Sequence, residues 1–300
     1  MHIDPTDNMV NGYSGGMSWS GGMEFITGKF YKTIGLDSWG LWTKGPFSEK
    51  DGKYKGEACS QKGDTLEGLA KLITGDSKDA KLIKQNFRKG KPRQRIKVAP
   101  LIEKLEETLR HNVAEATKSF NANFGGFPIG KKPDGGSDFI DDFFQENPLQ
   151  VPSCECRTAA VLVLAKGLIN TIGSESFNKL FTIRDLTSPS LRSNRRLIKG
   201  TRGVALKDVK KGDWGYIKGY ANYVASAENA WGGENVIYVG NDEFWGHDLG
   251  TDTYEGIVKK LKELGEVVDG PNGKFIGWLN YTEFFKMSYL AQRLFDHRNK

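Results

Sequence analysis

An apolar stretch at residues 152–173 constrains the fold of this 300-residue chain more than any other feature. It reads PSCECRTAAVLVLAKGLINTIG, and its middle is almost entirely apolar, which predicts a buried helix. We expect Ser153 to cap the start of this helix and Gly173 to end it. Glu155 and Cys156 then lie in the first turn, at the positive end of the helix dipole. A thiol in that position is biased toward thiolate, the nucleophilic form.

The overall composition is that of a globular protein, with 38% hydrophobic and 11% aromatic residues. The chain is long enough for one or two domains, and no apolar run is long enough to span a membrane. No signal-peptide pattern opens it, so export would need another route or a larger parent protein. The formal net charge is +6, and Lys and Arg concentrate in residues 78–104 and 184–211. Because no aromatic residues interleave the basic residues of 192–202, we expect solvated faces or loops and no nucleic-acid partner.

The chain contains three cysteines, Cys59, Cys154 and Cys156. An odd number excludes complete pairing in intrachain disulfides, and Cys154 and Cys156 are too close at a helix start for an easy bridge. None of the four histidines lies at ligand spacing from this pair, so a zinc site is not expected. A free cysteine is often a small core residue. The sequences that accompany Cys156 nevertheless favour a working nucleophile.

The first third of the chain divides into two parts. Residues 1–56 are rich in Gly and aromatic residues without a helical period, and we expect a partly ordered leader. Residues 57–101 predict a small βααβ module, with strands at 59–61 and 94–98 and helices at 65–73 and 79–86. Opened by Lys-Gly-Asp-Thr-Leu, this order resembles the LysM module. The resemblance implies contact with N-acetylglucosamine polymers such as peptidoglycan; a role as a spacer stays open.

We expect residues 102–300 to form one catalytic domain of the α+β class. A helix at 100–120 carries apolar residues at four-residue steps, and a Gly/Pro-rich linker or lid follows at 121–137. Beyond these and the central helix, the pattern predicts helices at 138–146, 175–181, 253–264 and 282–295, and strands at 214–218, 235–239, 243–247 and 274–279. A nucleophile-bearing helix followed by an antiparallel sheet is the order of papain-like thiol enzymes.

Three short segments carry chemistry: ECRTA at 155–159, WGGENV at 231–236 and FWGHDLG at 244–250. A strand, a turn at 240–242 and a return strand fit between Glu234 and His247, and such a hairpin would bring the two side chains together. A thiol nucleophile needs a base, and burial would raise the pKa of Glu234 into a useful range. Taken alone, Glu234 would more often be a surface carboxylate at a turn, and His247 would more often be a hydrogen-bonded structural residue.

Together these segments resemble the small bacterial spore-coat protein-glutamine γ-glutamyltransferases. The resemblance runs from about residue 148 to residue 260 and also includes Gly212-Asp213, the strand at Tyr216 and the helix end at 171–173. It implies a papain-like (NlpC-type) core at about 148–290. By the same resemblance, Cys156 attacks a glutamine side-chain amide, expels ammonia and forms a thioester.

The resemblance also assigns the remaining catalytic and substrate-binding roles. Glu234 would activate first the thiol and then the incoming lysine amine, Glu155 could substitute for it, and His247 would support them. Trp231 and Trp245 would wall a narrow tunnel that keeps water from the thioester. The partners implied are two protein substrates, a glutamine donor and a lysine acceptor, with no cofactor and no metal. The remaining residues expected to bind substrate are Asn235 and Tyr216.

Some features depart from the spore-coat enzymes. Cys154 adds a second thiol beside the nucleophile, and the segment 181–211 is longer and more basic than expected. Everything before residue 148 is unlike those enzymes and resembles the architecture of bacterial polymorphic toxins. That architecture would imply delivery into a target cell and an immunity protein as partner.

Three alternative functions stay open. The first is a glutamine deamidase, in which water resolves the thioester. The second is an NlpC-type cell-wall peptidase or amidase, in which His247 would be the base. The third is a catalytically silent binding module that uses the LysM-like segment.

Overall fold

The computed structural model describes residues 49–50, 53–54, 57–59, 63–89, 94–124, 136–146, 151–181, 198–220, 231–268 and 274–296. Most of the predicted leader lies outside these residues. Its end contributes two short paired strands, β1 (Glu49–Lys50) and β2 (Lys53–Tyr54). The predictions for residues 125–135 and 182–197 also lie outside the described residues.

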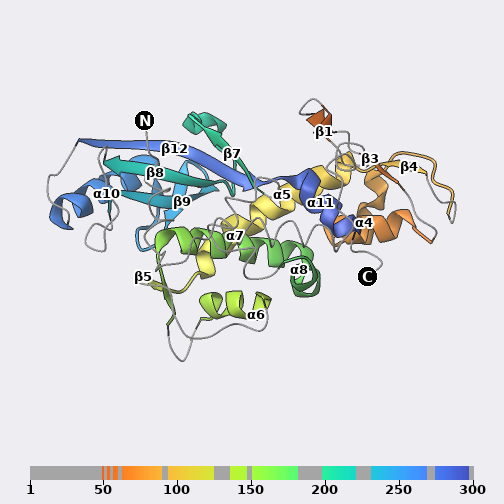
Figure 1. Cartoon of the computed structure of the whole chain (residues 1–300), viewed down its shortest axis with the longest axis horizontal. Helices are drawn as coiled ribbons and strands as arrows, with labels where there is room; N and C mark the ends of the chain where they lie inside the picture. Colours follow the sequence, from red (N-terminus) through yellow and green to blue (C-terminus); the bar gives the residue numbers. More distant parts are fainter. Residues whose placement is uncertain are drawn as a thin grey trace, which may run out of the picture.

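A six-stranded antiparallel sheet, in the order β11-β10-β9-β8-β12-β7, forms one layer of the molecule (Figure 1). Four of its strands confirm the sequence predictions, whereas β7 and β11 were not predicted. Residues 282–285, expected in the last helix, instead continue a long strand. The strands are β7 (Ile198–Arg202), β8 (Trp214–Tyr220), β9 (Gly233–Gly240), β10 (Glu243–Gly246), β11 (Gly250–Thr253) and β12 (Phe275–Phe285).

The hairpin of β9 and β10 has the predicted turn. Asn241 and Asp242 both have positive φ, at 55° and 60°, and Gly240 has a φ of 100°. Asn and Asp tolerate this left-handed conformation, which matches the twist of the flanking strands. Because β10 pairs antiparallel with β9, the chain returns after Gly246 to the end of the sheet where Glu234 lies.

Helices cover both faces of the sheet. The α5 and α7 helices pack side by side against β9, and α10 packs on β8, β10 and β12. Three shorter helices, α4, α8 and α11, lie beyond the end of the sheet and pack on α5 or α7 (Figure 1). The helices are α4 (Leu66–Thr74), α5 (Ala99–Ala116), α6 (Gly136–Asp141), α7 (Cys156–Ile172), α8 (Ser174–Leu180), α10 (Tyr254–Val268) and α11 (Met287–Asp296).

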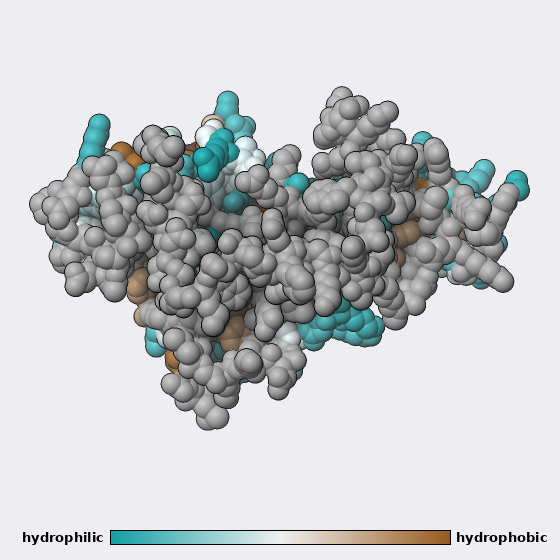
Figure 2. All heavy atoms as spheres, in the orientation of Figure 1, coloured by the Kyte–Doolittle hydropathy of each residue, from teal (hydrophilic) through white to brown (hydrophobic). Residues whose placement is uncertain are grey.

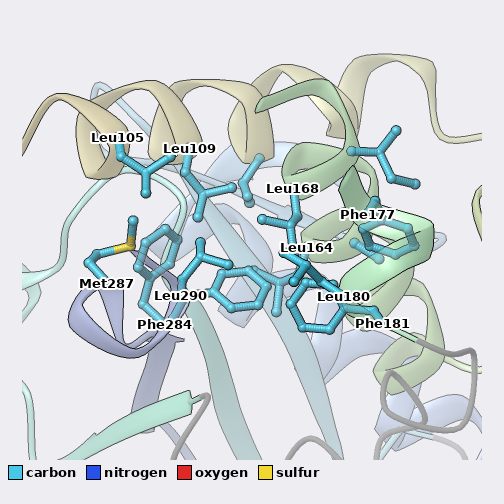
Figure 3. Close-up of a cluster of buried hydrophobic side chains, with 14 of the residues drawn as sticks. Leu105, Leu109, Leu164, Leu168, Phe177, Leu180, Phe181, Phe284, Met287 and Leu290 are labelled. Atoms are coloured by element: carbon cyan, nitrogen blue, oxygen red, sulfur yellow. The ribbon is translucent and has the colours of Figure 1, made fainter. Parts of the chain in front are cut away.

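The alternation of strand residues divides the core into two clusters. Ile237 joins the larger cluster with α5 and α7, while its neighbour Val236 joins the smaller one with α10. In the larger cluster, side chains from α5, α7, α8, β12 and α11 point toward one another (Figure 3). The predicted antiparallel sheet and buried helix, and with them the mixed helix-and-sheet class, are confirmed.

The βααβ segment has the predicted element order, with a 3-10 helix at Ser77–Leu82 in place of the second α-helix. Its strands, β3 (Glu57–Cys59) and β4 (Arg95–Lys97), pair antiparallel. The apolar face of α4 packs on α5 and α11, so this segment and the residues that follow share one hydrophobic core. Its likeness to a LysM module stays a prediction.

Among the described residues that Figure 2 colours, hydrophobic side chains appear on this face in small separate areas. Within the described ranges, no single helix is long and apolar enough to cross a membrane. One pair, α7 with α8, passes by length and composition together but is bent by 119° at Gly173.

Candidate active site

The nucleophile candidate, Cys156, is the first residue of α7. The predicted cap was wrong: Ser153 lies in the short strand β6 (Ser153–Cys154), which pairs parallel with β5 (Asn123–Phe124), and Glu155 takes the cap position. Gly173 does end the helix, with a φ of 81° and its N–H bonded to the carbonyl of Ile169. Cys156 therefore stands where an extended segment turns into a buried helix, and it remains half-buried.

Asn235 of β9 lies against the sulfur. Its Nδ2 atom donates to Cys156 Sγ at 3.3 Å, and its main-chain N–H also bonds to the sulfur. The Oδ1 atom of the same side chain accepts from Trp214 Nε1 at 3.0 Å. The predicted substrate-binding residue Asn235 is thus buried and in direct contact with the candidate nucleophile.

Glu234 is the second group at the sulfur. Its side chain is only 1% exposed, and its carboxylate interacts with the Cys156 thiol and with the main chain of His247. Its Oε1 atom is buried and has no hydrogen-bond partner within the described part of the chain. A buried oxygen without a hydrogen-bond partner lowers stability by about 1–3 kcal/mol. A substrate atom that donates a hydrogen bond to this oxygen would therefore be stabilised in the site.

Burial shifts the pKa values of the whole group. It raises the pKa of Glu234 well above its ordinary value, as the sequence predicted. Burial, and then the charge of Glu234, also raise the pKa of Cys156, which is opposite to the prediction from the helix dipole. Burial raises the pKa of Cys154 to about 12. The thiol of Cys156 therefore needs its neighbours to remove the proton.

His247 follows β10 and is fully buried, as part of the predicted hairpin. Its Nε2 atom lies 3.1 Å from the carbonyl oxygen of Cys154, and its other polar interaction is with the main chain of Asn123. Phe120 packs edge-on against its ring at 5.3 Å. Burial lowers the pKa of His247. The imidazole thus holds β5 and β6 in place and makes its hydrogen bonds with main-chain groups, not with the sulfur.

Glu155 directly precedes the nucleophile, at the cap position of α7. It is half-buried, and its Oε1 atom accepts a hydrogen bond from Thr158 Oγ1 at 3.3 Å. Its charge also raises the pKa of Cys156. A second carboxylate is therefore close enough to act electrostatically on the sulfur.

The two predicted tunnel tryptophans have different surroundings. Trp231 stacks on Phe124 of β5 with ring centroids 5.5 Å apart, and Phe124 is exposed. Trp245 instead packs edge-on against Phe120 in the main core. Phe124 was not predicted as a site residue because its segment has only the sequence pattern of a linker.

Tyr216 was also predicted to bind substrate. It pairs with Asn235 across β8 and β9, and it is buried and stacked on Tyr281, with ring centroids 5.9 Å apart. Tyr216 therefore lies beside the site as part of the packed sheet. No group of three or more His, Cys, Asp or Glu side chains in the described ranges is arranged to hold a metal ion.

Comparison with known proteins identifies the family. A sequence profile for protein-glutamine gamma-glutamyltransferase matches residues 111–267, more than half of the chain. The chain belongs to the protein-glutamine gamma-glutamyltransferase family. The match begins inside α5, so the prediction that everything before residue 148 is unlike these enzymes was wrong for residues 111–147. The close packing of α5 on α7 makes this helix part of the same unit.

Two curated bacterial members of the protein-glutamine gamma-glutamyltransferase family illustrate the similarity. The protein of Bacillus pumilus is 31% identical over 178 residues, which are 53% of this chain and 69% of the relative. The protein of Bacillus cereus strain G9842 is 36% identical over 124 residues, which are 41% of this chain. The chain spans only 42% of the length of that relative.

A transglutaminase from Geobacillus stearothermophilus, solved without its C-terminal extension, is similar in structure. It has a TM-score of 0.47 and 22% sequence identity, and the match covers 64% of this chain and 96% of that one. The segment matched by the transferase profile contains Cys156, Glu234, Asn235 and His247.

Proposed function

We propose that the chain is a protein-glutamine γ-glutamyltransferase that carries the glutamyl group on Cys156. The observation that supports this best is the buried carboxylate of Glu234 at the Cys156 thiol, with one oxygen unpaired among the described residues. Acyl transfer by a thiol needs a neighbouring group that takes the thiol proton and later returns it. A carboxyl group with a raised pKa in contact with the sulfur can do both.

In the acylation step, the proton of the Cys156 thiol passes to Glu234 and the sulfur attacks the carboxamide carbon of a glutamine side chain. An S–C bond forms and the C=O π electrons move to oxygen. When the carbonyl reforms, the C–N bond breaks and Glu234 returns its proton to the nitrogen. Ammonia leaves and a thioester remains on Cys156.

In the transfer step, a lysine amine attacks the thioester carbon and gives a proton to Glu234. The S–C bond breaks as the new amide C–N bond forms, and the proton on Glu234 restores the thiol. The unpaired Oε1 atom supports this role, because an ammonia or amine nitrogen bonded there would satisfy it. Glu155 is the second carboxylate beside the sulfur and would partly replace Glu234.

Hydrolysis competes with transfer, so the thioester must be kept from water. The stacked pair of Trp231 and exposed Phe124 supplies an apolar wall beside β6, which leads into Cys156, and β9, which carries Glu234. We assign the glutamine donor and the lysine acceptor to this side of the site. Trp245, buried against Phe120, would support the wall from behind.

The finer parts of the expected architecture remain proposals. The nucleophile at the start of a buried helix, followed along the chain by an antiparallel sheet, supports a papain-like (NlpC-type) core. Glycan contact through residues 57–101, action as a delivered toxin and an immunity protein as partner rest only on the sequence resemblances.

Amine incorporation tests the proposed function. The protein would be incubated with a glutamine-bearing protein and a labelled primary amine, beside a Cys156→Ala variant. We expect Cys156-dependent labelling of protein; its absence contradicts the proposal. Ammonia release without amine uptake would instead identify a deamidase, which uses the same thioester.

The hydrogen bonding of His247 disfavours the cell-wall peptidase. That reaction needs an imidazole at the sulfur, whereas this imidazole interacts with the main chain of Asn123 and Cys154.

A further inference from the structure

The amide of Asn235 bridges a buried tryptophan and the sulfur of Cys156. An indole N–H only donates, so the atom that faces Trp214 must be the amide oxygen. The amide nitrogen then points to Cys156 Sγ, 3.3 Å away. The orientation of the amide is therefore fixed by chemistry, and the group that faces the sulfur is a hydrogen-bond donor.

Trp214 is held firmly enough to set that orientation. Its side chain is completely buried and packs in the main core. In the pairing of β8 with β9, Trp214 lies opposite Ile237 and Tyr216 lies opposite Asn235. Trp214 and Asn235 are thus diagonal neighbours across adjacent strands, within reach of long side chains.

The charged groups near the sulfur act against a thiolate. Glu234 from β9 and Glu155 at the cap of α7 both raise the pKa of Cys156, and burial raises it further. Asp248 raises the pKa of Glu234, which makes that carboxylate a better acceptor for the thiol proton. The His247 ring lies against the main-chain carbonyl of Cys154. Arg157, the buried cation that follows Cys156 on α7, is not among the groups that shift the pKa of Cys156. The hydrogen bonds from Asn235 are the interactions that lower the pKa of Cys156.

We propose that Asn235 is a catalytic residue that stabilises the Cys156 thiolate, and that Trp214 is a positioning residue that aims its amide. This extends the proposed function, because it takes Cys156 as the nucleophile. Two buried acids in contact favour holding one proton between them. When that proton moves from sulfur to Glu234, the pair keeps one negative charge, now on sulfur, where two N–H groups of Asn235 receive it. Asn235 thereby takes the part that an imidazolium plays in other thiol enzymes.

The pH dependence of alkylation tests the first half of the proposal. Iodoacetamide labelling of the Cys156 peptide would be followed by mass spectrometry in the wild-type chain, Asn235→Ala, Asn235→Asp and Glu234→Gln. We expect Asn235→Ala to raise the apparent pKa of Cys156 by about one unit and slow labelling about tenfold near neutral pH. Glu234→Gln should shift the profile to lower pH, because it removes the negative charge.

Asn235→Asp keeps an acceptor for Trp214, so it preserves the buried hydrogen bond while replacing the donor at the sulfur with an oxygen. It should slow labelling at least as much as Asn235→Ala. Profiles of the two Asn235 variants that match the wild type would overturn the catalytic role of Asn235, whatever Trp214 variants do.

A double-mutant cycle tests the positioning role. Trp214→Phe should raise the apparent pKa of Cys156 in the wild-type background and leave it unchanged in the Asn235→Ala background. Trp278→Phe, on the exposed side chain of β12, is the matched control and should leave the profile unaltered. The positioning role of Trp214 would be overturned if Trp214→Phe shifted the apparent pKa of Cys156 equally in both backgrounds. It would also be overturned if Trp214→Phe failed to fold while Asn235→Ala folded and kept the wild-type profile.

Alkylation of Cys156 requires no acyl transfer, so the alkylation profiles test the role of Asn235 independently of the amine-incorporation assay. Shifted profiles without amine incorporation by the wild-type chain would count only against the transferase function.

Discussion

The Nε2 atom of His247 lies 3.1 Å from the carbonyl oxygen of Cys154, two residues before the candidate nucleophile. The imidazole is 2% exposed and also interacts with the main chain of Asn123 on β5. It therefore fixes the extended segment that delivers Cys156 to the start of α7. We therefore propose a positioning role for His247 and proton transfer by Glu234.

The first prediction compares these two residues. Glu234→Gln should reduce amine incorporation about 100-fold or more, the usual scale for loss of a general acid and base. Its residual activity would come from Glu155. His247→Gln should cost less in kcat, because the amide can still bond to the Cys154 carbonyl. Steady-state kinetics of both variants would check the order, and a larger loss at His247 would favour the peptidase-like mechanism.

The second prediction concerns stability and pH. Burial raises the folded-state pKa of Glu234, so above its ordinary pKa the unfolded chain loses a proton that the folded chain keeps. This contribution to stability is present at low pH and is lost as pH rises through the raised pKa. Thermal melts between about pH 5 and about pH 8 should therefore show Glu234→Gln gaining stability relative to wild type as pH rises. A constant difference across that range would contradict the shift.

The third prediction concerns the apolar wall. Phe124→Ala removes the exposed ring that stacks on Trp231, so water should reach the thioester more easily. We expect the ratio of ammonia released to amine incorporated to rise several-fold. The matched control is Trp278→Ala, another exposed aromatic side chain, which should leave the ratio unchanged. An unchanged ratio in Phe124→Ala would place the wall elsewhere.

The fourth prediction tests the contact that places α7. A Cβ at Gly167 would clash with Val113 Cγ2 and lie 2.7 Å from the Val113 main chain on α5. Because backbone cannot move aside cheaply, Gly167→Ala should destabilise the fold by about 1–3 kcal/mol despite its better helix propensity. Asn170→Ala, at an exposed position of the same helix, should be neutral or slightly stabilising. Equal denaturation midpoints for the two variants would exclude the close contact.

The elements with strong local patterns were predictable from the sequence. Periodic apolar residues gave α5 and α7, and alternating residues bounded by Gly, Asn and Asp gave β8, β9 and β10. The β9–β10 hairpin followed from its turn residues, and with it the closeness of Glu234 to His247. Short strands such as β6 and β7 were missed because they are defined by pairing with distant segments.

The finer features of the site depended on contacts that a sequence does not display. Helix position alone predicted an easily ionised Cys156, but burial and a neighbouring carboxylate act in the opposite direction. Asn235 was expected to bind substrate, yet its amide faces the sulfur because Trp214 occupies its oxygen. Phe124 was missed because it meets Trp231 only in three dimensions.

The proposed function depends on one step, the acylation of Cys156 by glutamine with the assistance of Glu234. Intact-mass and peptide-mass analysis after mixing the chain with excess glutamine peptide, without an amine, tests it directly. We predict an adduct equal to the peptide less one ammonia on the peptide that contains Cys156, released by a primary amine and strongly reduced in Glu234→Gln. No adduct, or an adduct on Cys154 or Cys59, would exclude Cys156 as the acylated nucleophile.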